Sequence, residues 1–128
     1  MKVLNLIIKQ KYLDAILAGR KVQEFREIRP TTEKKYIEID NEGYAVEDEK
    51  GNCVPLKYDA IRFFVGYNKD RDSALVEVVG AHTEVFVDDN GEPIRYDYKG
   101  MDYWAEQIVY DLGKILEHNI RDKSKIII

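Results

Sequence analysis

Short runs of β-branched, aliphatic and aromatic residues recur along the chain, and turn-forming residues separate them. The runs at 3–8, 21–28, 58–67 and 74–87 have the composition of strands. Gly, Asn and Asp fill the gaps between them, as in the stretch 88–91. A chain interrupted this often has little room for long helices. We therefore expect an α+β fold, with a small, strongly bent sheet or open barrel of about five to seven strands and flanking helices.

Several stretches leave a choice of local structure. The run 74–87 holds two strand lengths, and Gly80 inside it predicts a bend or a bulge. Turn residues on both sides of 44–48 predict a hairpin there. The stretch 31–39 fits either a short helix or a strand. The last residues, 121–128, fit a final strand or a loose end.

Two segments have the apolar spacing of helices. The first is expected over 9–18, because Gly19 follows where a left-handed residue would close the helix. Its apolar stripe consists of Tyr12, Leu13, Ile16 and Leu17. The second is expected over 103–118, with Asp102 as its N-cap. Its apolar face would consist of Trp104, Ile108, Leu112, Ile115 and Leu116.

Length and composition predict an ordinary intracellular domain. A chain of 128 residues has a common size for a single domain, so we expect one domain over residues 1–128. The one cysteine, Cys53, cannot form an intramolecular disulfide. The first residues lack a signal-peptide pattern, and no stretch approaches the roughly 20 apolar residues of a membrane span. These features predict a cytoplasmic protein with no membrane partner.

Charge is distributed unevenly along the chain. The formal net charge of −4 argues against non-specific coating of nucleic acid. Residues 1–35, however, contain nine Lys/Arg and four Asp/Glu, whereas the rest of the chain contains eleven and twenty. A basic first quarter on an acidic body is typical of a focused anion-binding site. Solvated lysines at the ends of elements would give the same pattern, and charge alone favours that simpler interpretation.

The sequence gives no pattern for metal or cofactor chemistry. His82 and His118 have no partners at metal-ligand spacing, and no phosphate-binding loop or dinucleotide fingerprint occurs. We therefore expect no metal and no cofactor. Cys53 lies in a polar, turn-rich stretch with no histidine nearby in sequence, which disfavours a catalytic thiol.

A more specific signal lies in residues 19–26, GRKVQEFR. This segment fits the pattern G-x-K-x-x-E-x-R, begins at a helix-closing glycine and enters a strand. The sequence before it, YLDAILAGRK, and the later strand ALVEVVG at 74–80 extend the pattern. Together these features resemble the ASCH family of the PUA-like superfamily. The resemblance covers the first quarter of the chain and the strand around Glu77, whereas 31–54 have no counterpart.

The resemblance implies a PUA-like barrel with a cleft between the barrel and the first helix, suited to RNA or a nucleobase. One branch of the family hydrolyses acetylcytidine at its exocyclic amide, using a lysine, a threonine three positions later and a glutamate on a later strand. Lys21 and Glu77 match that lysine and glutamate. Glu24 stands at the threonine position, so the hydroxyl is missing. The candidate catalytic set is therefore Lys21, Glu24 and Glu77.

The same segment supplies a candidate ligand site. Lys21 and Arg26 would form a positive floor held by Glu24, and Arg20 and Arg29 would extend its field. In a regular strand Glu24 and Arg26 share one face and Lys21 the other. The alternative is thus a surface Glu24–Arg26 pair beside a solvated Lys21, which contributes less than about 1 kcal/mol. The candidate ligand-binding set is Gly19, Arg20, Lys21, Glu24, Phe25 and Arg26.

Glu77 and the aromatic residues also have two interpretations each. In an enzyme, Glu77 would act as general base toward water while Lys21 stabilises the oxyanion. In a binding module, Glu77 would be the outward polar residue of an alternating strand. Base stacking requires exposed aromatic faces. The candidates for that role are Phe25, Phe63, Tyr67 and Trp104, the last also fitting a core position.

Three functions follow from these observations. The first is a module that binds RNA or a modified nucleoside through a basic cleft built by the 19–26 segment. The second is a small amidohydrolase that acts on an acetylated cytidine-type nucleoside, or a ribonuclease, of the same architecture. The third is a protein-binding module whose acidic body makes the contact. Salt-sensitive RNA binding would favour the first over the third.

Overall fold

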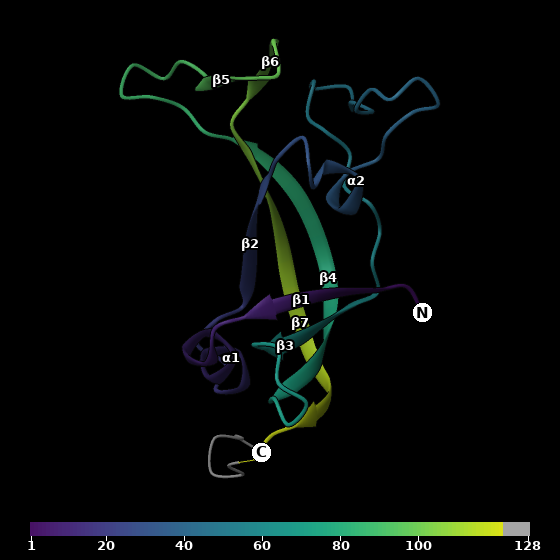
Figure 1. Cartoon of the computed structure of the whole chain (residues 1–128), viewed down its shortest axis with the longest axis vertical. Coiled ribbons are helices and arrows are strands. Elements are labelled where there is room, and N and C mark those ends of the chain that lie inside the picture. Colours follow the sequence, from purple (N-terminus) through teal and green to yellow (C-terminus); the bar gives the residue numbers. More distant parts are fainter. Residues whose placement is uncertain (122–128) are drawn as a thin grey trace. The chain divides into compact units, whose positions relative to one another are not determined.

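The structure, a computed structural model, describes residues 1–121 (Figure 1). Strands predominate, and two helices accompany them, so the expected combination of strands and helices is confirmed. In chain order the elements are β1 Val3–Ile8, α1 Gln10–Leu17, β2 Gln23–Ile28, α2 Glu33–Tyr36, β3 Ala60–Val65, β4 Ser73–Val85, β5 Arg95–Tyr98, β6 Met101–Trp104 and β7 Glu106–Asn119. No helix in this part of the chain has the length and apolar content that crossing a membrane requires.

Five of the strands form one sheet, in the order β1-β3-β4-β7-β2, and β5 pairs with β6. β1 and β3 are parallel, with Val3 opposite Ala60, whereas β3 and β4 are antiparallel, with Ala60 opposite Glu77. The strand order leaves β1 and β2 at the two edges of the sheet. The described strands do not close into a barrel, so a PUA-like barrel stays a prediction.

The chain divides into two compact units, and the expectation of a single domain stays a prediction. Unit 1 contains Met1–Glu24, Lys57–Gly80 and the chain from Tyr110 onward. Unit 2 contains Phe25–Leu56 and Ala81–Val109. The candidate segment 19–26 therefore contributes residues to both units.

The core of unit 1 forms where β1, β3 and α1 supply apolar faces. β1 alternates, with Leu4, Leu6 and Ile8 buried, as expected for a strand with one face in the core. α1 buries Leu13, Ile16 and Leu17, which confirms three members of its predicted stripe. Tyr12 was expected in that stripe but is 43% exposed. Its position at the edge of the stripe, one residue before Leu13, turns its ring toward solvent.

Unit 2 is built from short elements and turns. Within the stretch 31–39 the chain forms a four-residue helix, α2. Tyr36, the last residue of this helix, and Ile37, which follows it, are both buried. The hairpin expected around 44–48 consists only of isolated bridges, such as Glu47 with Cys53. Its turn is closed by the Asp48 carboxylate, which accepts hydrogen bonds from the amides of Lys50 and Asn52 at 2.9 and 3.0 Å.

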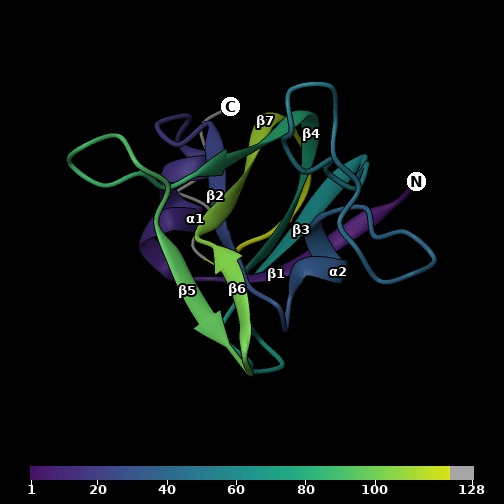
Figure 2. The same ribbon diagram turned by 90° about the horizontal axis from the view of Figure 1, so that it is seen from above.

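β5 and β6 pair as a short antiparallel ribbon within unit 2 (Figure 2). Its turn places Lys99 and Gly100 at φ 51° and 82°, the positive values that a two-residue hairpin loop favours. The rings of Tyr96 and Tyr103 stack across the two strands at a centroid distance of 5.9 Å. The residues expected to begin a helix are therefore part of this ribbon.

The helix predicted over 103–118 is wrong, because most of this segment forms β7. Ile108, Val109 and Tyr110 are consecutive and each at most 1% exposed, which is typical of a strand covered on both faces and impossible for one stripe of a helix. Gly113 and the β-branched residues further reduce helix propensity. The two strands predicted within 74–87 form the single strand β4.

Candidate functional site

The segment from Gly19 to Glu24 connects α1 to β2 in unit 1. Gly19 adopts φ 76°, the left-handed conformation predicted for the residue that closes the helix. The amides of Arg20 and Lys21 then both donate to the Ala15 carbonyl, at 2.9 and 3.1 Å. These bonds fix the chain as it leaves α1 and place Lys21 just before β2.

Lys21 and Glu24 form an ion pair at the start of β2. Lys21 Nζ lies 3.3 Å from Glu24 Oε1 and donates a 2.7 Å hydrogen bond to the Gln23 carbonyl oxygen. Glu24 is buried, at 5% exposure, so its carboxylate is screened from water. A buried carboxylate needs such charge-assisted partners, and Lys21 supplies one. The expectation of a solvated Lys21 is therefore wrong, whereas the Glu24–Arg26 contact stays a prediction.

The side chain of Tyr12 adds an aromatic surface next to Lys21. Lys11 Nζ and Lys21 Nζ lie 4.9 and 5.7 Å from the centroid of the Tyr12 ring. Arg20 is also exposed and follows the C-terminal end of α1, next to Lys21 in the sequence. We call Lys11, Tyr12, Arg20 and Lys21 the α1 basic surface. Tyr12 was missed in the sequence because helical spacing assigned it to the core.

Glu77 lies in β4, also within unit 1, over the backbone of β7. Its Oε1 accepts a hydrogen bond from the Lys114 amide at 3.3 Å. A Cβ on Gly113 would overlap that same oxygen and lie 2.7 Å from Val79 Cγ1. Because Gly113 has no side chain, the Glu77 carboxylate can occupy the space beside it. A shared role of Glu77 and Lys21 stays a prediction.

A second polar contact in unit 1 joins the start of β2 to β7. Gln23 Nε2 donates to Asp111 Oδ1 at 2.8 Å, and a Cβ on Gly80 would approach Asp111 Oδ2 to 3.0 Å. The Leu112 amide also donates to the Val22 carbonyl at 2.9 Å. These contacts hold the β2 strand entry, and with it the Lys21–Glu24 pair, against the sheet.

The other candidate residues lie in different environments. Phe25 and Arg26 belong to unit 2, where Phe25 is exposed and Arg26 half-buried. Phe63 is fully buried, so its proposed stacking role is wrong. Tyr67 and Trp104 are exposed and keep aromatic surface available.

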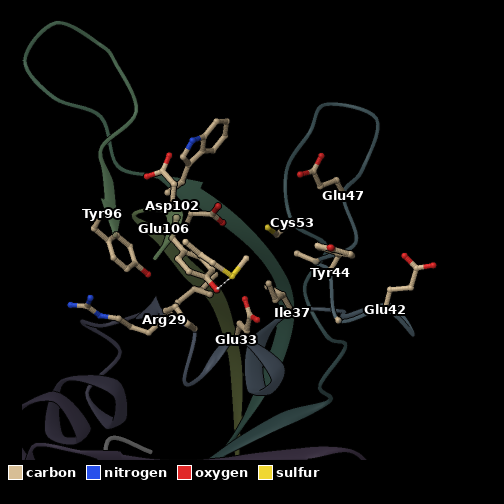
Figure 3. Close-up of a pocket in the computed structure, with 17 residues that line it drawn as sticks. Arg29, Glu33, Ile37, Glu42, Tyr44, Glu47, Cys53, Tyr96, Asp102 and Glu106 are labelled. Carbon is tan, nitrogen blue, oxygen red and sulfur yellow. Dashed lines mark hydrogen bonds between the residues drawn. The ribbon is translucent and has the colours of Figure 1, made fainter. Parts of the chain in front are cut away.

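Unit 2 contains a pocket of about 560 Å³ that sequence reasoning did not find (Figure 3). In this view Tyr96 lies on one side, Tyr44 and Cys53 on the other, and Glu33 and Glu106 between them. Its aromatic lining consists of Tyr44, Tyr96, Tyr103 and Trp104, and its carboxyl groups are Glu33, Glu42, Glu47, Asp102 and Glu106. These residues come from distant parts of the sequence, so no local motif joins them.

Burial governs the protonation of three groups in the pocket lining. Desolvation raises the pKa of the Glu106 carboxyl, and the nearby charges of Glu47 and Glu33 raise it further, against a hydrogen bond with Cys53 that lowers it. Desolvation also raises the pKa of Glu33, against the opposing charge of Lys34. Burial, followed by the charge of Glu106, raises the pKa of Cys53 to about 12. A catalytic thiolate at Cys53 is therefore disfavoured.

Arg29 is the cationic side chain in the described lining of this pocket. Its guanidinium lies 5.3 Å from the centroid of the Tyr96 ring. Its Nε is also 3.1 Å from Glu27 Oε1. Arg29 was predicted to extend the positive field around Lys21, but here it lies in an acidic and aromatic environment.

The two units carry opposite charge. Among the described residues, unit 1 contains eleven Lys/Arg and eight Asp/Glu, whereas unit 2 contains seven and fifteen. The formal charges are therefore +3 and −8. Within residues 1–121, no group of three or more His, Cys, Asp or Glu side chains is placed to hold a metal ion.

No family model, curated protein or solved structure matches the chain. The resemblance to the ASCH family therefore stays a prediction, and the local geometry of each unit carries the functional argument.

Proposed function

We propose that this chain is an RNA- or modified-nucleoside-binding module, as its resemblance to the ASCH family implies, and that the α1 basic surface makes the contact. The observation that carries the proposal is the Lys21 ammonium, held by buried Glu24 and the Gln23 carbonyl beside the exposed ring of Tyr12. A fixed cation attracts a phosphate, and an aromatic ring beside it can stack on a base.

The lysines over the Tyr12 ring do not prevent stacking. A cation–π contact at an exposed site contributes about 0.5–1 kcal/mol, whereas base–aromatic stacking contributes roughly 1–3 kcal/mol. A base can therefore displace the exposed Lys11 side chain from the ring, and the Lys11 ammonium then remains available for the adjacent phosphate. The net positive charge of unit 1 favours an anionic ligand in the same way.

Titration of a fluorescently labelled single-stranded RNA, followed by anisotropy, tests this proposal. We expect affinity to fall as salt rises from about 50 to about 200 mM, because binding releases counterions. Tyr12→Ala should weaken binding by about tenfold, the equivalent of 1.4 kcal/mol of stacking. Lys11→Gln should weaken binding at low salt and reduce the salt slope by about one unit.

Lys69→Gln provides the matched control, because Lys69 is an exposed lysine of unit 1 outside the α1 basic surface. It should leave the affinity close to that of the wild type. Lys11 is preferred to Lys21 for the charge test, since Lys21→Gln would also remove the ion pair with the buried Glu24. Equal effects of Lys11→Gln and Lys69→Gln, or binding that ignores salt, would contradict the proposal.

Hydrolysis of an acetylated cytidine-type nucleoside is the second candidate function. Its basis is the match of Lys21 and Glu77 to the catalytic pair of the deacetylase branch, together with the position of Glu77 in a half-buried site in unit 1. In this reaction Glu77 would take a proton from water, which adds to the amide carbonyl, and the nucleoside amine would leave with a proton. Because Glu24 provides no hydroxyl, we expect turnover close to the uncatalysed rate.

Incubation of the purified protein with acetylcytidine, followed by chromatography of free cytidine, distinguishes the two functions. Rapid release that falls by about 10²–10⁴-fold in Glu77→Gln would establish the hydrolase. Absence of release, combined with salt-sensitive RNA binding, would establish the binding module.

A further inference from the structure

The pocket of unit 2 combines an apolar aromatic wall with an excess of carboxyl groups. Five acidic side chains line it against the single guanidinium of Arg29 within the described lining. Arg29 is already engaged by Glu27 and by the Tyr96 ring. Asp102 is likewise engaged, since Arg95 Nη1 lies 3.2 Å from its Oδ2. Lys34 opposes the charge of Glu33, and Glu106 shares a hydrogen bond with Cys53, yet the acidic groups of the lining still outnumber the cations beside them.

We propose that this pocket binds a small organic cation, with its ammonium or guanidinium group beside Glu33 and Glu106 and its apolar part against the aromatic wall. The proposal is independent of RNA binding by unit 1. Its ligand has the opposite charge, and all the lining residues belong to unit 2.

The aromatic rings favour such a ligand over a simple metal ion. Tyr96 and Tyr103 stack on each other in the β5–β6 ribbon, and Trp104 follows them in the same hairpin. Cations with an apolar shell bind to aromatic faces through the ring quadrupole, most strongly at Trp. The cavity volume of about 560 Å³ lies in the range of small-molecule sites.

Electrostatics support the same ligand class. Burial and the charges of Glu47 and Glu33 raise the pKa of Glu106, and burial raises that of Glu33, so burial disfavours the ionised form of both groups. A bound cation would stabilise both ionised forms. The formal charge of −8 on the described residues of unit 2 also concentrates cations around it.

Trp104 provides a direct probe, because it is the one tryptophan of the chain and it lines the pocket. The wild-type protein would be titrated with choline and with agmatine, which present an ammonium and a guanidinium group. The neutral isostere of choline, 3,3-dimethyl-1-butanol, is the matched control ligand. We expect a saturable change of Trp104 fluorescence with at least one cation, and binding of the neutral isostere that is at least about tenfold weaker.

Substitutions of single acidic residues then test which carboxylates contribute to binding of the cation. Glu106→Gln and Glu33→Gln should each weaken binding of the cation by about tenfold, because each removes one carboxylate near the charge. Glu49→Gln, an exposed acidic residue of unit 2 outside the lining, should leave it unchanged. Circular dichroism verifies that each variant is folded.

The comparison of choline with its isostere uses only the wild-type protein, so it remains decisive if a variant fails to fold. Equal affinities for the two ligands would overturn the proposal. It would also be overturned if neither cation gave a saturable change up to roughly 10 mM, well above the affinity of a weak fragment. Displacement of a bound cation by RNA at Trp104 would show that the pocket is an RNA site instead.

Discussion

At the scale of single residues, burial rather than sequence neighbourhood determines the chemistry of unit 2. Cys53 and Glu106 are far apart in sequence, yet they share a hydrogen bond and each changes the titration of the other. Glu24 in unit 1 follows the same rule, because its buried carboxylate forms an ion pair with Lys21. Two predictions follow from these environments.

Glu106 should make the protein less stable as pH rises. Its folded pKa is raised above the ordinary value of 4.5, so the folded state keeps a proton that the unfolded chain has lost. The associated stability is complete below that ordinary value and is lost as pH rises through the folded pKa. Urea unfolding from about pH 5 to about pH 8 should therefore show that Glu106→Gln gains stability relative to wild type as pH increases. A difference that is constant or opposite in sign would contradict this prediction.

Cys53 should be a slow nucleophile in the folded protein. Its pKa of about 12, against an ordinary value of 9.0, lowers the thiolate fraction at pH 8 by about a thousandfold. Alkylation by iodoacetamide should accordingly be about three orders of magnitude slower in buffer than in urea. Glu106→Gln should accelerate the folded-state reaction, because the Glu106 charge contributes to the raised pKa. Equal rates in buffer and urea would contradict the assigned environment.

At the scale of elements, β7 shows how a strand can resemble a helix in sequence. Leu112, Ile115 and Leu116 recur at helical intervals, but the strand is stabilised by hydrogen bonds to neighbouring strands and by burial of Ile108 to Tyr110. A glycine such as Gly113 would weaken a helix. In the strand it has a specific use, since it leaves room for the Glu77 carboxylate.

Gly113→Ala should therefore destabilise the protein. An alanine in a strand normally improves on glycine by about 0.5–1 kcal/mol, but overpacking here costs about 1–3 kcal/mol and should dominate. The reason is the overlap of the new Cβ with Glu77 Oε1 and its closeness to Val79. The free energy of unfolding would be measured in urea.

A double-mutant cycle separates the two causes. Adding Glu77→Ala to Gly113→Ala should restore part of the lost stability, because the overlapping carboxylate is removed. Gly80→Ala is the matched control and should cost less, since its Cβ would meet only Asp111 at 3.0 Å. If Gly113→Ala leaves the free energy of unfolding unchanged or increases it, the space above Gly113 is not needed for stability.

At the scale of the whole molecule, the chain combines one positive and one strongly negative unit. The net charge of −4 conceals this division, because each unit is assembled from separate segments of the chain. The basic first quarter predicted from the sequence contributes to unit 1, but residues 25–35 of that quarter belong to unit 2. Each unit is consequently suited to ligands of opposite sign.

Salt should stabilise unit 2 selectively. Its fifteen acidic and seven basic described residues repel one another, and added NaCl screens this repulsion. Amide hydrogen exchange at about 0.05 and 0.5 M NaCl should show increased protection in unit 2, equivalent to about 1 kcal/mol or less, and little change in unit 1. Stronger protection of unit 1 would contradict the charge division.

Local patterns in the sequence are sufficient to predict the elements whose structure depends on adjacent residues. Alternation in 3–8 predicted β1, helical spacing in 9–18 predicted α1, and Gly19 was correctly placed at the left-handed position that ends it. Turn residues also marked the gaps between most strands. These predictions succeed because periodicity and backbone restriction act within a few residues of the chain.

Which faces are buried and which side chains meet depends on the folded arrangement of distant segments. This arrangement made 106–119 a strand, exposed Tyr12, joined Lys21 to Glu24 and placed Glu77 over Gly113. It also gathered the lining of the unit 2 pocket from Ile28 to Glu106. Hydrogen-bond partners in a sheet and the desolvation of a carboxyl group depend on residues far away in sequence, so no local pattern specifies them.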